Sequence, residues 1–152
     1  MDTNIIVDFF INQIKHMKQG EALKIPSKLK FLSENPDKIK VYTSFLTKAE
    51  VMRKLISEYS ATEQDIELLW EDFIRLLSCG YVEKTEISGA LVDIVSRIPM
   101  KKKTMVNFIH LLIAKESDCY FLTGDEEAIR KIRETKFYDK AISYEELRQM
   151  FP

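Results

Sequence analysis

Apolar positions along the chain recur with two different spacings. Stretches with an apolar residue at every third or fourth position predict amphipathic helices, and short apolar runs predict buried strands. Helices are expected at residues 4–17, 27–32, 47–59, 62–77, 88–98, 104–116, 126–133 and 143–150. Strands are expected at residues 39–42, 81–84, 119–122 and 141–142. This alternation predicts an α/β fold with three layers, in which a central, mostly parallel sheet carries helices on both faces.

Composition narrows the class of protein. The chain has 152 residues, 45% of them hydrophobic and 31% charged, which predicts one globular domain covering residues 1–152. No apolar run approaches the roughly 18 residues that a membrane-spanning helix needs, so no membrane partner is expected. Cys79 and Cys119 lack metal-binding or disulfide-type spacing, which favours reduced thiols and a cytoplasmic protein. The net charge of −1 limits any RNA binding to local basic patches.

Four polar side chains fall where a parallel sheet would gather them. Asp125 follows the expected strand 119–122, Glu50 lies one turn into the helix after strand 39–42, and Asn107 lies early in its helix. With Asp2, they are expected at the carboxyl edge of the sheet, where ligands bind in such folds. Clustered carboxylates repel one another unless a cation binds them, and oxygen ligands favour Mg²⁺ or Mn²⁺. Such ions activate water and stabilise the charge that develops on a phosphodiester.

Several short motifs follow one another along the chain. They are Asp2-Thr3-Asn4 before an apolar run, Thr47 to Val51 with Glu50 inside it, the helix Asn107 to Ala114, Thr123-Gly124-Asp125 after a strand, and the ending at residues 141–147. Each motif alone is weak, but the ordered set spans nearly the whole chain. In this order the motifs resemble those of the PIN-domain family, a family of metal-dependent ribonucleases.

This resemblance implies a function and a set of site residues. The expected activity is hydrolysis of RNA phosphodiester bonds, either by the toxin of a toxin–antitoxin pair or by an RNA-processing enzyme. The expected catalytic residues are Asp2, Glu50 and Asp125, and the expected Mg²⁺ or Mn²⁺ ligands are these three with Asn107. RNA, an antitoxin protein and a second copy of the chain are the expected partners. The basic run Lys101, Lys102 and Lys103 is expected to meet RNA phosphates, although a solvated loop is the alternative.

The chain departs from the family pattern at two places. The family has a strand before its first aspartate, whereas only Met1 precedes Asp2; this first strand is truncated, or it lies before the printed start, or residues 4–7 form it and Asp8 is the acid. We favour Asp2 because Thr3 and Asn4 follow it as in the family. The second departure is Asn107, which keeps a carbonyl ligand but lacks the charge of the family's aspartate. Metal affinity and turnover should both fall, so the alternative function is an RNA- or protein-binding module with weak or lost catalysis.

A third hypothesis gives the acids no site at all. Thr47 and Glu50 have the spacing of a capping box, and Asp125 could simply cap the next helix. Asn107 is then an ordinary first-turn residue. Independently of this hypothesis, His110, three positions later, is expected to be a packed, hydrogen-bonded core residue rather than a ligand or base. On this hypothesis the protein is a small α/β interaction module.

Overall fold

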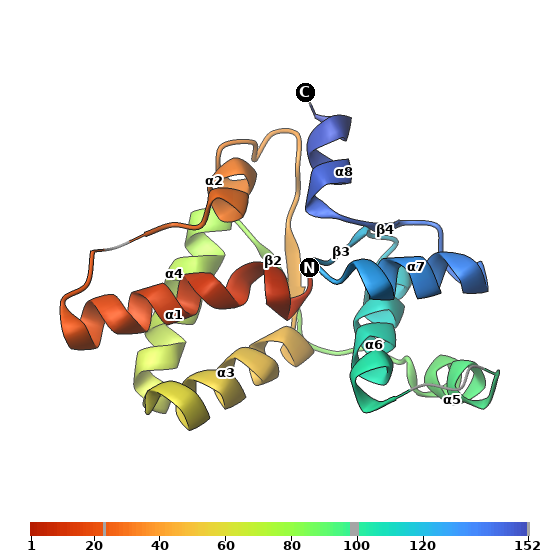
Figure 1. The fold of residues 1–152 in the computed structure, drawn as a ribbon, viewed down its shortest axis with the longest axis horizontal. Coiled ribbons are helices and arrows are strands. Elements are labelled where there is room, and N and C mark those ends of the chain that lie inside the picture. Colours follow the sequence, from red (N-terminus) through yellow and green to blue (C-terminus); the bar gives the residue numbers. More distant parts are fainter. Residues whose placement is uncertain (23, 98–100, 152) are drawn as a thin grey trace. The chain divides into compact units, whose positions relative to one another are not determined.

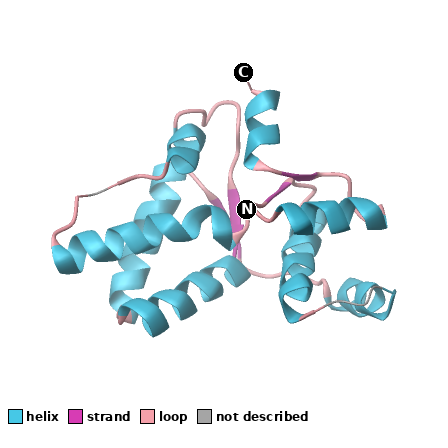
Figure 2. Ribbon diagram, in the orientation of Figure 1, coloured by secondary structure: helices cyan, strands magenta, loops and turns pink. Residues whose placement is uncertain are grey.

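The structure, a computed structural model, describes residues 1–22, 24–97 and 101–151 (Figure 1). Eight helices and four short strands lie in this part of the chain. Its internal contacts divide the chain into two compact units. Thr3–Val82 form the N-terminal unit, whereas Met1–Asp2 and the chain from Glu83 onward form the C-terminal unit. Each unit is mostly helical and contains one pair of strands (Figure 2).

The N-terminal unit packs four helices around a short parallel strand pair. Its elements are α1 (Thr3–Gln19), α2 (Ser27–Ser33), β1 (Tyr42–Ser44), α3 (Phe45–Tyr59), α4 (Glu63–Leu77) and β2 (Gly80–Val82). Tyr42 lies opposite Gly80 in the parallel register of β1 and β2. Helix α1 contacts α2, α3 and α4, so its apolar face is central to this unit. The unit therefore has its own core.

Aromatic rings form much of that core. Phe10 of α1 stacks on Trp70 of α4 with ring centroids 5.4 Å apart, and Phe9 meets Phe10 edge to face at 5.3 Å. Phe73 contacts both phenylalanines. Offset and edge-to-face ring pairs add to the stability that their buried apolar area provides. The packing of α1 against α4 thus depends on these aromatic rings.

The C-terminal unit is built around α6. Its elements are α5 (Ser88–Arg97), α6 (Lys102–Glu116), β3 (Phe121–Leu122), α7 (Glu126–Thr135), β4 (Ala141–Ile142) and α8 (Tyr144–Met150). Strands β3 and β4 pair in parallel, with Phe121 opposite Ala141. Helix α6 contacts α5, α7 and β3, and its buried Phe108 and Leu111 join Phe121 and Ile132 in one apolar cluster.

The structure confirms most of the elements predicted from the sequence. All eight helices are present, and the capping box predicted at Ser143 and Glu146 begins α8. Parallel strand pairing is also confirmed, and the fold is α/β. Among the described residues the strands form two separate two-stranded sheets, so the single central sheet in three layers and the single domain stay predictions. The predicted end of the helix 88–98, before Pro99, lies outside the described residues.

The alternative in which residues 4–7 form a first strand is wrong, because they belong to helix α1. Two predicted element starts were also wrong. The strand predicted at 39–42 is observed at Tyr42–Ser44 instead. Its parallel pairing with β2 begins with Tyr42 opposite Gly80, and the Gly80 N–H donates to the Val41 carbonyl at 2.9 Å. Helix α3 begins at Phe45 with Ser44 as its N-cap, so Thr47 lies inside the helix.

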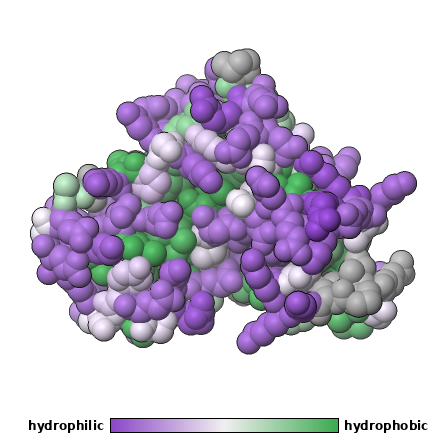
Figure 3. Space-filling view, viewed as in Figure 1, coloured by the Kyte–Doolittle hydropathy of each residue, from purple (hydrophilic) through white to green (hydrophobic). Residues whose placement is uncertain are grey.

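The visible surface of both units is largely hydrophilic, with apolar residues showing between the polar ones (Figure 3). No helix in the described part of the chain combines the length and the apolar character that crossing a membrane requires.

Adjacent leucines on α4 test the core of the N-terminal unit. Leu69 is 4% exposed, whereas its neighbour Leu68 is 60% exposed. Leu69→Ala should lower the free energy of unfolding by about 2–5 kcal/mol, because it removes buried methyl groups and leaves a cavity. Leu68→Ala, the matched control, should change it by no more than about 0.5 kcal/mol. Urea denaturation measures both, and equal losses would contradict the packing of α4.

Candidate functional site

Asp2 is held at the carboxyl end of β3 by its backbone and its side chain. Its N–H donates to the Leu122 carbonyl at 2.9 Å, which places Asp2 beside β3. The Thr123 hydroxyl donates to Asp2 Oδ2 at 2.7 Å. Asp2 is 4% exposed, and a carboxylate so deeply buried requires such donors. The side chain therefore has a defined position in the C-terminal unit.

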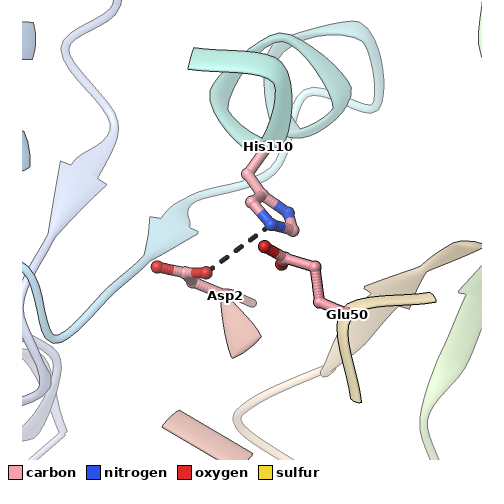
Figure 4. A group of neighbouring side chains, drawn as sticks. All are labelled: Asp2, Glu50 and His110. Atoms are coloured by element: carbon pink, nitrogen blue, oxygen red, sulfur yellow. Dashed lines mark ion pairs between the residues drawn. The ribbon is translucent and has the colours of Figure 1, made fainter. Parts of the chain in front are cut away.

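His110 of α6 faces the other oxygen of this carboxylate. Its Nε2 lies 3.6 Å from Asp2 Oδ1, an ion pair whenever the imidazole is protonated. The ring is buried and stacks over Phe121 at 6.3 Å between centroids. Figure 4 shows the two side chains with the ion pair as a dashed line; the third side chain in that view, Glu50, belongs to α3 of the N-terminal unit.

His110 is the residue that the sequence did not assign to the site. It is buried and packed, as the core interpretation predicted, but it also contacts Asp2. The available signal was its position one turn after Asn107, on nearly the same face of the helix. Its approach to Asp2 brings together distant parts of the chain, so spacing alone could not reveal it.

Asp125 begins helix α7. Its Oδ1 accepts from the Ala128 N–H at 3.0 Å, so the N-cap predicted as an alternative is present. Its own N–H donates to the Thr123 hydroxyl at 3.1 Å. The hydroxyl of the fully buried Thr123 thus accepts from Asp125 and donates to Asp2. One threonine positions both aspartates of this unit.

The second oxygen of Asp125 meets two donors from α6. Asn107 Nδ2 lies 3.2 Å from Asp125 Oδ2, and Lys103 Nζ lies 3.3 Å from the same atom. Burial acts to raise the pKa of Asp125, but the hydrogen bond from Ala128, the nearby Lys103 ammonium and the Asn107 amide together lower it below its ordinary value. The carboxylate is therefore ionised and already compensated by protein groups.

Glu50 occupies the second turn of α3 in the N-terminal unit. The Thr3 hydroxyl donates to its Oε2. The capping box predicted as an alternative for Thr47 and Glu50 is wrong, because Ser44 caps the helix and accepts from the Thr47 N–H at 3.5 Å. Glu50 is half-buried, and its carboxylate bonds to the residue that follows Asp2 in the chain.

The other candidates are distributed over both units. Asp8, the alternative first acid, is exposed on α1. Lys101 is the N-cap of α6, and Lys101, Lys102 and Lys103 are all exposed. The structure thus places Asp2, Asn107 and Asp125 in the C-terminal unit, the two aspartates at the end of β3, and Glu50 in the N-terminal unit.

The donor set around Asp2 has the chemistry of a divalent-cation site. It offers a carboxylate oxygen and an imidazole nitrogen, both ligands that Mn²⁺ accepts. Asp125 differs in its partners, because its two oxygens accept from the Ala128 N–H, the Asn107 amide and the Lys103 ammonium.

Comparison with known proteins identifies the family. The sequence pattern of the PIN domain matches residues 1–134, so the chain belongs to the PIN-domain family. This is a nuclease family whose members generally depend on divalent metal ions and commonly bind RNA. The matched region includes both units' candidate residues, from Asp2 to Asp125. No curated protein and no solved structure is similar enough to the chain to count as a match.

The lowered pKa of Asp125 predicts a dependence of stability on acid pH. A carboxyl whose pKa is lower in the folded state contributes stability above its ordinary pKa, near 4, and loses it as the pH falls through the folded value. Asp125→Asn keeps a good N-cap and removes the charge. The wild type should unfold with a higher free energy than the variant near neutral pH, and the difference should shrink below about pH 4. Denaturant unfolding between pH 7 and 3 measures this, and a difference that does not change with pH would argue against it.

Proposed function

We propose that this PIN domain is a metal-dependent ribonuclease whose metal site is built on Asp2. The observation that carries the proposal is the buried Asp2 carboxylate, held by Thr123 at the end of β3 with His110 beside it. Burial of a carboxylate next to an imidazole, at a strand end, is an arrangement that a divalent cation stabilises. Family membership supports the same function.

Glu50 is the second carboxylate of the proposed site. The support comes from two contacts, each inside one unit. Thr3 bonds to Glu50 in the N-terminal unit, and Asp2 bonds to Thr123 in the C-terminal unit. Thr3 follows Asp2 directly in the chain, and the motif order supports Glu50 as a second ligand. The single three-layer domain over residues 1–152 stays a prediction from the sequence.

Mg²⁺ or Mn²⁺ is the proposed cofactor, and the His110 nitrogen favours Mn²⁺. When bound, such an ion activates water and stabilises negative charge on the phosphodiester. Asp2 and Glu50 hold the ion, and Thr123 orients Asp2. The exposure of Lys101 and Lys102 at the start of α6 supports a role in binding RNA phosphates. The toxin role, the antitoxin partner and the homodimer stay predictions from the sequence.

One observation favours the alternative of weak catalysis. The Asn107 amide donates to Asp125, and Lys103 contacts the same carboxylate oxygen. Where the family carries an aspartate, this chain therefore reduces the charge that would draw a metal ion to Asp125. The second candidate function is an RNA-binding PIN domain with slow or no cleavage.

Two glutamates of α3 provide a matched test of the ribonuclease. Glu50→Gln removes a proposed metal ligand, whereas Glu58→Gln changes an exposed residue paired with Lys54. With Mn²⁺, Glu50→Gln should lower cleavage of single-stranded RNA by about 100-fold or more, since even loss of a group that orients a ligand costs 10–100-fold. Glu58→Gln should cleave like the wild type. A panel of labelled RNAs resolved on denaturing gels measures both.

Equal cleavage by the two variants would exclude Glu50 from the site. If the wild type cleaves no RNA but binds it in the presence of Mn²⁺, the RNA-binding alternative replaces the ribonuclease. Thermal melts of both variants without metal show whether any loss of cleavage comes from unfolding.

Restoring the family's charge at position 107 tests the cause of weak catalysis. Asn107→Asp replaces an amide donor 3.2 Å from Asp125 with a second carboxylate, so the metal-free protein should become less stable. Mn²⁺ should bind about tenfold more tightly, a gain of about 1.4 kcal/mol, and RNA cleavage should rise. Calorimetric titration and thermal melts with and without Mn²⁺ measure these effects. Unchanged Mn²⁺ affinity would mean that Asn107 is an ordinary helix residue.

A further inference from the structure

Three lysines stand where the electrostatics of a helix disfavour them. Helix α6 begins at Lys102, and Lys103 follows. Its N-cap, Lys101, makes no capping hydrogen bond with its side chain to the described residues, and the first turn contains no acid. The N-terminus of a helix carries partial positive charge, so cations there are destabilising and acids are preferred. Helix stability therefore does not account for this basic run.

One of these lysines has a specific partner. Lys103 Nζ lies 3.3 Å from Asp125 Oδ2, the oxygen that also accepts from Asn107 Nδ2 at 3.2 Å. The lysine side chain is 82% exposed, whereas the Asp125 side chain is 16% exposed. Asp125 is thus fixed by its cap to Ala128, while the ammonium approaches it from solvent.

We infer that Lys103 is a tethered cation that occupies Asp125 and competes with a divalent metal ion for this carboxylate. The inference rests on the proposed function and concerns the same site. A metal ion that binds Asp125 Oδ2 needs the position held by the ammonium, and the two positive charges repel at this separation. Asn107 acts in the same direction, because its amide donor also occupies that oxygen.

The exposure of Lys103 makes this competition reversible. Solvent screens the 82% exposed Lys103 ammonium, so its departure from Asp125 costs little stability. A backbone phosphate of RNA offers it an alternative partner. Metal loading at Asp125 is therefore coupled to phosphate binding by Lys103.

Mn²⁺ binding by neighbouring lysine variants tests the competition. Lys103→Met removes the ammonium that contacts Asp125, and Lys102→Met removes the adjacent ammonium, also exposed in the same helix turn. Lys103→Met should bind Mn²⁺ about tenfold more tightly than the wild type, the change that about 1.4 kcal/mol produces. Lys102→Met should change the affinity much less, and Lys103→Arg should resemble the wild type. Electron paramagnetic resonance of free Mn²⁺ measures the affinities without any RNA.

The Asp125→Asn background locates the effect. There, Lys103→Met should give no gain in affinity beyond that of Lys102→Met, because the shared carboxylate is absent. Binding of Mn²⁺ by Lys103→Met alone would support the inference most strongly. Equal affinities for Lys103→Met and Lys102→Met, with Mn²⁺ bound by the wild type, would overturn the competition and leave the proposed ribonuclease standing. If no variant binds Mn²⁺, the metal-dependent function fails and the competition with it.

Discussion

The candidate site depends on how one buried carboxylate is anchored. Asp2 stands at the start of the chain, yet its backbone bonds to β3 and its side chain accepts from the fully buried Thr123. A buried carboxylate needs such hydrogen-bond donors to replace the water it has lost. Because Thr123 also accepts from the Asp125 N–H, one hydroxyl aligns both acids with the end of the strand. The short Thr-Gly-Asp motif is therefore as much an anchor for Asp2 as a source of Asp125.

The two aspartates of the C-terminal unit are compensated in different ways. Asp2 accepts from the Thr123 hydroxyl and lies beside the His110 imidazole. Asp125 meets an amide and an ammonium from α6, so protein groups already balance its charge. Asn107, where the family has an aspartate, therefore changes the surroundings of Asp125, because its amide donates a hydrogen bond to that carboxylate.

Helical periodicity and the family motifs made most of the helices predictable from the sequence. The bounds of the short strands and the contacts between residues distant in the sequence could not be predicted from it. The strands have two or three residues, too few for a period to fix their bounds. Ser44 and Thr47 are both good N-caps three residues apart, so propensity could not choose between them, and the structure selects Ser44. The pairs His110–Asp2 and Lys103–Asp125 form across the fold and leave no spacing signal. Motif order predicted the candidate residues Asp2, Glu50, Asn107 and Asp125. It could not predict which hydrogen-bond donors surround each acid.

The most direct measurement is anomalous diffraction from crystals of the wild-type protein grown with saturating Mn²⁺. We expect an anomalous peak within bonding distance of Asp2 Oδ1, with Glu50 as a second ligand and Lys103 displaced only if the ion also binds Asp125. Well-ordered Asp2 and Glu50 side chains with no Mn²⁺ peak at either, under conditions where the ion is seen elsewhere in the crystal, would contradict it.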